Sequence, residues 1–130
     1  MIHKNAEIVR RGYHAFNTAD LKTLTELFDP NASWQTPGKS STAGLRKGQN
    51  EVFALFGRYG GETNGTFKAE LKTVCADEEG RVVGIHHNSA MRNGKVLATD
   101  CCITFEVRNG RIVSGKEYFF DVANWDAFWA

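Results

Sequence analysis

The chain has 130 residues, 42% of them hydrophobic, with nine Phe, three Trp and three Tyr, which suits one globular domain over 1–130 and excludes a disordered chain. The formal net charge is +1 and the Lys and Arg residues are scattered, so we expect no nucleic-acid partner. No stretch approaches the roughly 18 apolar residues of a membrane span, and the charged N-terminus does not resemble a signal peptide. We therefore expect a cytoplasmic protein without a membrane partner.

Two helices are predicted near the N-terminus. The first covers 4–17, where apolar residues spaced by three and four form one face: Ile2, Ala6, Val9, Tyr13 and Phe16. After a break at 17–20, a second helix should bury Leu21, Leu24, Leu27 and Phe28 and end at Pro30.

The next segment predicts a short strand, a loop and a third helix. The strand covers 32–36 around Trp34, and 37–48 reads as a surface loop because it is rich in Gly, Ser and Lys. The third helix covers 49–59 and ends at Gly60-Gly61. Its apolar residues are Val52, Phe53, Leu55 and Phe56.

Four alternating segments follow and predict an antiparallel meander. The first strand turns Phe67, Ala69, Leu71 and Thr73 to one face, and the others cover 81–92, 96–107 and 111–121. Asn93-Gly94 and Asn109-Gly110 are strong hairpin signals. The tail 122–130, with Trp125, Phe128 and Trp129, should pack across the domain or at a subunit contact. Segregated helices and strands predict an α+β fold, a cone of three helices in a curved antiparallel sheet, whose apolar interior suits a small hydrophobic organic ligand.

The three cysteines, Cys75, Cys101 and Cys102, are odd in number and lack C-x-x-C spacing, so free thiols in a reducing compartment are expected. His86 and Glu117 could supply two metal ligands, but no third His or Cys stands at metal spacing. We therefore predict no metal and no cofactor.

Alternation predicts which side chains of the last strand face inward. Glu106 should face water, so Ile103 and Phe105 face the interior. A three-residue loop at 108–110 would pair Val107 with Arg111. The inward set of the last strand is then Val113, Gly115, Glu117, Phe119 and Asp121. A two-residue turn would reverse this prediction.

Glu117 is thereby predicted to lie on an apolar wall, where burial would raise the pKa of its carboxyl and suit it to acid/base catalysis. The alternative places it at the mouth of the cone, hydrated or paired with an Arg. Asp121 lies nearer the strand end, at the rim or as a cap for the tail.

His86 shares the inward face with Asn88, Ala90, Thr99, Cys101 and Ile103 if Asn93-Gly94 forms a two-residue type I′ turn. It could then shuttle a proton or donate a hydrogen bond beside Glu117. The alternative is a core histidine bonded to a neighbour, and which of His86 and His87 faces inward stays open.

The catalytic candidates are thus Glu117 and His86. The predicted binding set combines aromatic side chains that close the cone with inward strand residues: Tyr13, Phe16, Trp34, Phe53, Phe56, Asn88, Cys101, Ile103, Phe105, Phe119 and Asp121. Tyr13 needs a partner for its hydroxyl if buried.

The chain resembles the nuclear-transport-factor-2-like (NTF2-like) superfamily over nearly its whole length, and looks closest to its branch of SnoaL-like polyketide cyclases and relatives of ketosteroid isomerase. The segments 13–21, 27–34, 36–38 and 105–113 carry this resemblance. It implies the conical fold but no single reaction, because the superfamily hosts isomerases, cyclases, dehydratases, epoxide hydrolases and non-catalytic binders.

The steroid isomerase site does not carry over. That pattern has a base Asp before a Pro, where this chain has Thr36, and an oxyanion-binding Asp, where it has Ile103. Its helix-one Tyr maps onto Gly12, one position from Tyr13. The cyclase pattern fits better, since it has an acid seven residues after the turn Gly, and Glu117 follows Gly110 by seven.

Two functions remain open on the sequence. The first is an acid/base cyclase, isomerase or lyase for a small apolar carbonyl compound, and the second is a non-catalytic binding module with the same pocket. A homodimer is also expected, because the outward sheet face carries Cys102, Thr104, Tyr118 and Phe120.

Overall fold

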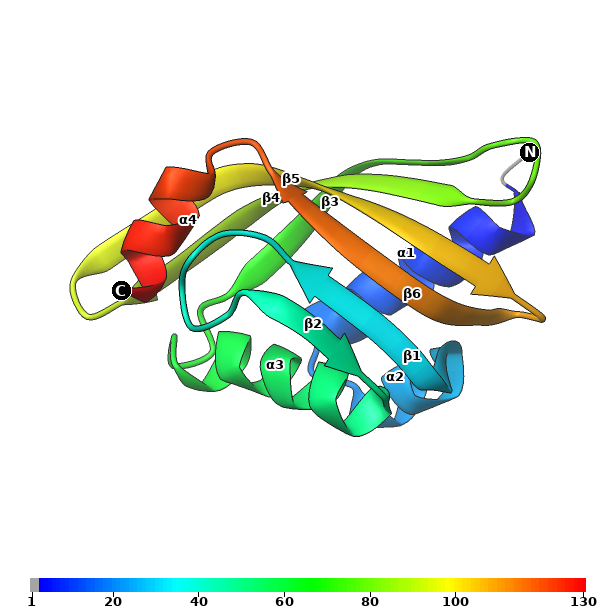
Figure 1. The fold of residues 1–130 in the computed structure, drawn as a ribbon, viewed down its shortest axis with the longest axis horizontal. Coiled ribbons are helices and arrows are strands. Elements are labelled where there is room, and N and C mark those ends of the chain that lie inside the picture. The colour runs from blue at the N-terminus through cyan, green and yellow to red at the C-terminus, as the bar shows by residue number, and fades with distance from the viewer. Residues whose placement is uncertain (1–2) are drawn as a thin grey trace.

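The computed structural model describes residues 3–130, so Ile2, expected on the face of the first helix, lies outside the described residues. Four helices and six strands follow one another in this part of the chain (Figure 1). Their order is α1 (Lys4–Asn17), α2 (Leu21–Leu27), β1 (Phe28–Thr36), β2 (Gly44–Lys47), α3 (Gln49–Gly61), β3 (Lys68–Ala76), β4 (Val82–Arg92), β5 (Lys95–Arg108), β6 (Arg111–Phe119) and α4 (Val122–Trp129).

The six strands form one sheet in the order β2-β1-β6-β5-β4-β3. Figure 1 shows the sheet bending over the helices, with α2 and α3 along its lower edge and α4 at one end. The α+β fold and the antiparallel meander β3–β6 are as predicted. The sheet also contains one parallel pair, β1 with β6, which local patterns did not predict.

Several predicted boundaries were wrong. Residues 44–47, expected in a loop, form the edge strand β2 against β1. The strand β1 begins at Phe28, so Pro30 lies inside it, at a place where the pairing with β6 is irregular and no ladder donor is needed. Leu21, predicted to be buried, is 59% exposed because it begins α2 on the solvent side.

The β4–β5 hairpin forms as predicted. Arg92 pairs with Lys95 across a two-residue turn in which Asn93 and Gly94 both have positive φ, 50° and 76°, the geometry of a type I′ turn. The pairing of His86 with Cys101 follows and turns both inward, where both are buried.

The β5–β6 turn differs from the prediction, but the predicted facing survives. Arg108 pairs with Arg111, so the turn has two residues rather than three. That alone would reverse the faces of β6. A β-bulge at Val113 inserts one extra residue and reverses them again, so Ile103 pairs with Glu117 and both face inward. Val113 itself, expected inward, is the extra residue of the bulge and is only half-buried.

A second bulge changes the end of β3. The register shifts between Leu71 and Thr73, so Thr73, predicted to face inward, is exposed and Val74 packs against the core instead.

The tail forms α4 and packs inside the chain. Trp125, Phe128 and Trp129 are all buried. The Trp125 ring stacks on Phe119 at 4.1 Å between centroids, and its Nε1 donates a hydrogen bond to Thr42 at 3.0 Å. The helix therefore closes one end of the cone.

Candidate functional site

A cavity of about 60 Å³ lies between the sheet and the helices α1, α2 and α3. Nine of the residues predicted for the site line it: Tyr13, Phe16, Trp34, Phe56, His86, Asn88, Ile103, Phe105 and Glu117. Most of the remaining wall is apolar. The polar groups of the cavity therefore come from few positions.

Four predicted site residues lie outside the cavity wall. Asp121 is exposed and caps α4 by accepting a hydrogen bond from the Asn124 backbone N–H. Phe119 and Cys101 face inward but lie toward the end of the sheet that α4 covers, where Phe119 stacks on Trp125. Phe53 is half-exposed on α3 and contacts the wall only through neighbouring rings.

Glu117 is buried in this cavity, with 4% of its surface exposed. Its Oε1 accepts three hydrogen bonds: from Trp34 Nε1 at 2.7 Å, from Thr36 Oγ1 at 2.8 Å and from the Tyr59 hydroxyl at 3.3 Å. Among the described residues, none donates to Oε2. One carboxyl oxygen is therefore fixed, and the other is left for a proton or a ligand.

The parallel pairing of β1 with β6 builds this arrangement. It sets Trp34 beside Gly115 and Gln35 beside Lys116, so Thr36 comes next to Glu117 on the inward face. A Cβ atom at Gly115 would lie 2.2 Å from the Trp34 ring. The glycine is therefore what allows the indole to lie across β6 and reach the carboxyl.

Opposing effects act on the pKa of Glu117. Desolvation by burial raises it, whereas the hydrogen bonds from Trp34, Thr36 and Tyr59 lower it, and the net direction is above the ordinary value. The same burial, together with the nearby Glu117 charge, raises the pKa of Tyr59, so this hydroxyl stays protonated and able to donate.

A second polar group on the wall is a chain of three side chains. The Tyr13 hydroxyl lies 2.8 Å from His86 Nδ1, and His86 Nε2 lies 2.9 Å from Asn88 Oδ1. Because an amide oxygen can only accept, Nε2 carries the ring hydrogen and Nδ1 accepts from the tyrosine. Gly84 makes room for this contact, since a Cβ there would lie 2.9 Å from the Tyr13 hydroxyl oxygen.

Burial lowers the pKa of His86 to about 4, so the imidazole is neutral near pH 7. Desolvation also raises the pKa of Tyr13, which keeps its hydroxyl protonated. The amide nitrogen of Asn88 donates to no described residue and is available to an acceptor in the cavity. His87, the neighbour of His86, points outward and pairs with Asp100 at 2.8 Å.

Sequence reasoning missed two partners of Glu117, namely Thr36 and Tyr59. A signal for each existed. Tyr59 follows Phe56 by three and Val52 by seven, on the buried face of α3. Thr36 alternates with Trp34 on β1 and is 2% exposed.

Over residues 3–130, the structure contains no group of three His, Cys, Asp or Glu side chains placed to hold a metal ion. Within the same range, no helix is long and apolar enough to cross a membrane.

An open cone of sheet and helices around a mostly apolar cavity, with one buried carboxyl, defines the class of small α+β proteins with an NTF2-like fold. Residues 9–115 match the SnoaL-like domain, and the chain belongs to this family. It is 35% identical to uncharacterized proteins of Mycobacterium tuberculosis and Mycobacterium bovis over 95% of both chains.

Solved structures agree with this assignment. Bal32a, from a soil-derived mobile gene cassette, is 61% identical over 98% of this chain and 97% of its own, with a TM-score of 0.97. An NTF2-like protein of unknown function from Burkholderia pseudomallei shares the fold at 21% identity, with a TM-score of 0.86 over 99% of both chains.

Proposed function

We propose that this chain is a cofactor-independent acid/base enzyme, a cyclase, isomerase or lyase, that acts on a small and mostly apolar carbonyl compound. The observation that carries the proposal is the carboxyl of Glu117, buried in an apolar cavity with Oε1 held by three donors and Oε2 free. A carboxyl of raised pKa is suited to exchanging a proton near neutral pH.

The proposed step is proton transfer at carbon. The anionic form of Glu117 takes a proton from a carbon next to the substrate carbonyl onto Oε2, leaving an enolate. The three donors on Oε1 hold the carboxyl in place in both protonation states. Returning the proton to a different carbon completes an isomerisation, whereas attack of the enolate carbon on a second carbonyl closes a ring, and the new alkoxide takes the proton.

Asn88 is the proposed partner of the developing enolate oxygen, because its amide nitrogen donates to no described residue. A neutral donor stabilises the enolate only where it is already oriented. The chain from Tyr13 through His86 fixes the orientation of this amide, since His86 donates to its oxygen.

The departures from the steroid isomerase pattern are consistent with this proposal. The position of the base Asp holds Thr36, which here donates to Glu117 at 2.8 Å. The carboxyl of Glu117 thus lies on the neighbouring strand β6, beside the position that the base Asp occupies in the isomerases. The proton transfer proposed above therefore requires no residue that the chain lacks.

A binding module without turnover is the second candidate. It is favoured by the small cavity and by the complete set of donors on Oε1, which would hold Glu117 equally well as a fixed acceptor for a ligand hydroxyl. Both functions use the same wall, so they must be separated by experiment.

Carbon-detected NMR titration of Glu117 is the first test, since it requires no known substrate. We expect its pKa above the ordinary value of about 4.3. An ordinary pKa would contradict the enzyme and favour the binding module.

Glu117→Gln tests turnover once a panel of small carbonyl compounds yields a substrate. The rate should fall by about 10²–10⁴-fold, with ligand affinity changed far less, because Gln keeps the shape and removes the exchangeable proton. Glu106→Gln, an exposed carboxyl on β5, is the matched control and should leave the rate unchanged. A full rate in Glu117→Gln would exclude the proposed role.

A further inference from the structure

Exposure to solvent distinguishes two of the side chains that line the cavity. Of the side chains that line it, only Phe16 on α1 and Phe56 on α3 are partly exposed, and the others are buried. The two rings meet edge to face, with centroids 5.4 Å apart and planes at 84°. They stand between the cavity and water.

The wall next to these two rings, on the side of α4, is two aromatic layers thick: Phe67 lies 5.8 Å from Phe16 and Tyr59 lies 6.5 Å from Phe56, between ring centroids. Tyr59 and Phe67 line the cavity there and stack at 5.0 Å with their planes 12° apart. Behind them lie Trp125 and Trp129 of α4, each within 6.4 Å of both rings. A ligand on this route would have to separate two layers of aromatic side chains.

Polar contacts hold both ends of α3. At its N-terminal end, Gln49 Nε2 donates to the carbonyls of Thr25 and Phe28, each at 3.1 Å. At its C-terminal end, Arg58 donates to the Ser41 carbonyl at 3.1 Å and pairs with Glu62.

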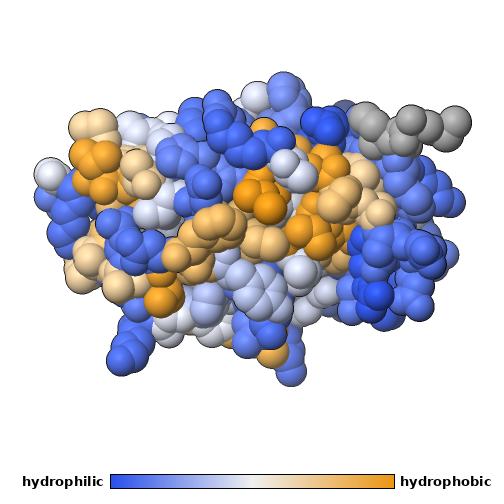
Figure 2. Space-filling view, turned by 90° about the horizontal axis from the view of Figure 1, so that it is seen from above, coloured by the Kyte–Doolittle hydropathy of each residue, from blue (hydrophilic) through white to orange (hydrophobic). Residues whose placement is uncertain are grey.

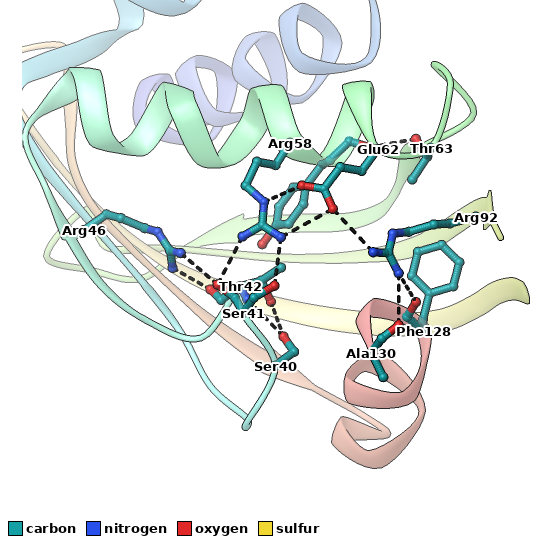
Figure 3. A network of polar contacts seen from close by, with 11 residues as sticks. Ser40, Ser41, Thr42, Arg46, Arg58, Glu62, Thr63, Arg92, Phe128 and Ala130 are labelled. Carbon is teal, nitrogen blue, oxygen red and sulfur yellow. Dashed lines mark hydrogen bonds and ion pairs between the residues drawn. The ribbon is translucent and has the colours of Figure 1, made fainter.

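Figure 3 shows how this C-terminal clamp continues. Glu62 also faces Arg92 of β4 at 3.6 Å, and Arg92 donates to the Phe128 carbonyl of α4 at 3.1 Å. The helix is therefore tied to the loop before β2, to β4 and to α4. A rigid-body shift of α3 would break several of these contacts together.

The backbone on the other side of the mouth is fixed as well. Asn17, next to Phe16 at the end of α1, forms two hydrogen bonds with the backbone of Ala69: its amide donates to the carbonyl at 2.8 Å and accepts from the N–H at 2.9 Å. The two phenyl rings are therefore the movable parts of the mouth.

We propose that Phe16 and Phe56 form a gate that opens by rotation of the two side chains, with α1 and α3 staying in place. The gate deepens the proposed function, because it controls access to the cavity of Glu117. The cavity has about 60 Å³, whereas pockets that enclose whole ligands run from roughly 300 Å³ upward. Turning the rings outward joins the space that they fill to the cavity, which admits a flat, uncharged molecule.

Quenching of tryptophan fluorescence by acrylamide tests the gate. Trp34 lines the cavity behind the two rings, whereas Trp125 and Trp129 are buried side chains of α4 and should stay buried in every variant. Truncating a large core side chain leaves a cavity, so Phe16→Ala and Phe56→Ala should each raise the quenching constant by about two-fold or more. Thermal melts show whether each variant is folded. If an alanine variant is unfolded, Phe16→Leu or Phe56→Leu replaces it in the same quenching measurement.

Two controls separate the gate from its alternatives. Phe53→Ala removes an equally half-buried ring of α3 that does not line the cavity, and Glu62→Gln loosens the clamp. Both should leave quenching at the wild-type value. No rise in the Phe16 and Phe56 variants, or an equal rise in Phe53→Ala, would overturn the gate, and an equal rise in Glu62→Gln would show that the helix moves instead.

Acrylamide reaches Trp34 whether or not chemistry follows, so this result is independent of turnover. A gate can be confirmed while Glu117 shows an ordinary pKa, in which case only the enzyme proposal fails. Conversely, a raised pKa of Glu117 without a rise in quenching would support the enzyme proposal and overturn the gate.

Discussion

Glu117 and His86 lie on one wall of the same cavity, yet burial shifts their pKa values in opposite directions. In both cases water is removed from the charged form, which favours the neutral acid in Glu117 and the neutral imidazole in His86. Each group keeps a hydrogen-bond partner, so neither is an isolated buried charge. The cavity near pH 7 therefore presents neutral His86 and a carboxyl that is poised to exchange a proton.

His86 gives a prediction for pH dependence. Burial lowers its pKa to about 4 from an ordinary value of 6.5. The folded state therefore binds the proton more weakly than the unfolded chain, and stability that is complete above pH 6.5 is lost as the pH falls toward 4. We expect the advantage of wild type over His86→Gln in unfolding free energy to shrink by about 2–3 kcal/mol over this range.

Urea denaturation of both proteins between pH 7.5 and 4 measures this difference. The raised pKa of Glu117 acts the other way, since its contribution is complete below the unfolded value and is lost as the pH rises through the folded one. Because Glu117 is present in both wild type and His86→Gln, its contribution cancels to first order in the difference between their unfolding free energies. A constant difference across the range, or an imidazole that titrates by NMR near 6.5, would refute the prediction.

At the scale of elements, one bulge decides the face of β6. The period of a strand is two, so the single extra residue at Val113 turns Lys116 outward and Glu117 inward. The predicted three-residue loop gave the same face for a different reason. The real turn is one residue shorter than predicted and the bulge adds one residue, so the two changes cancel. The facing of Glu117 was therefore predicted correctly from a turn that does not exist.

The helix α4 is expected to contribute strongly to stability. Trp125 is fully buried, stacks on Phe119 and donates to Thr42. Trp125→Ala should lower the unfolding free energy by about 3–5 kcal/mol, because it removes a large buried ring and leaves a cavity. Val122→Ala, in the exposed first turn of the same helix, should change it by less than about 1 kcal/mol. Equal losses in the two variants would contradict this role for α4.

For the whole molecule, the outer face of the sheet remains a proposed homodimer interface. Tyr118 on β6 is 44% exposed there, beside the half-buried Cys102 and the exposed Thr104, and Phe120, predicted on the strand, lies in the turn just after β6 and is 64% exposed. Figure 2 shows hydrophobic side chains lying among hydrophilic ones on the face seen from above. Apolar patches of this kind commonly mark an interface, and two-fold pairing is the commonest way to cover one.

Light scattering at micromolar concentration should give twice the mass of one chain. Tyr118→Lys combined with Phe120→Lys should give the mass of a single chain, since a charge in an apolar contact is costly. Leu21→Lys, an equally exposed apolar residue on α2, should remain a dimer. A monomeric wild-type protein would end the proposal.

The sequence by itself determined the local features. Helical spacing predicted α1 and α3, alternation predicted β3–β6, and Asn93-Gly94 predicted its turn, because each signal lies within a few neighbouring residues. The Asn93-Gly94 turn also placed His86 and Asn88 on the inward face, whereas Glu117 was placed there through a three-residue loop that the structure does not contain. The conical fold followed from the order of these elements along the chain, and the family from the resemblance carried by segments 13–21, 27–34, 36–38 and 105–113.

Only the tertiary structure decided the partners of Glu117. Trp34, Thr36 and Tyr59 are separated from it by 83, 81 and 58 residues, and no local propensity reaches across such distances. Their meeting depends on the parallel pairing of β1 with β6 and on the room left by Gly115. The edge strand β2 and the helix α4 were missed for the same reason, since both are stabilised by contacts with distant segments rather than by their own patterns.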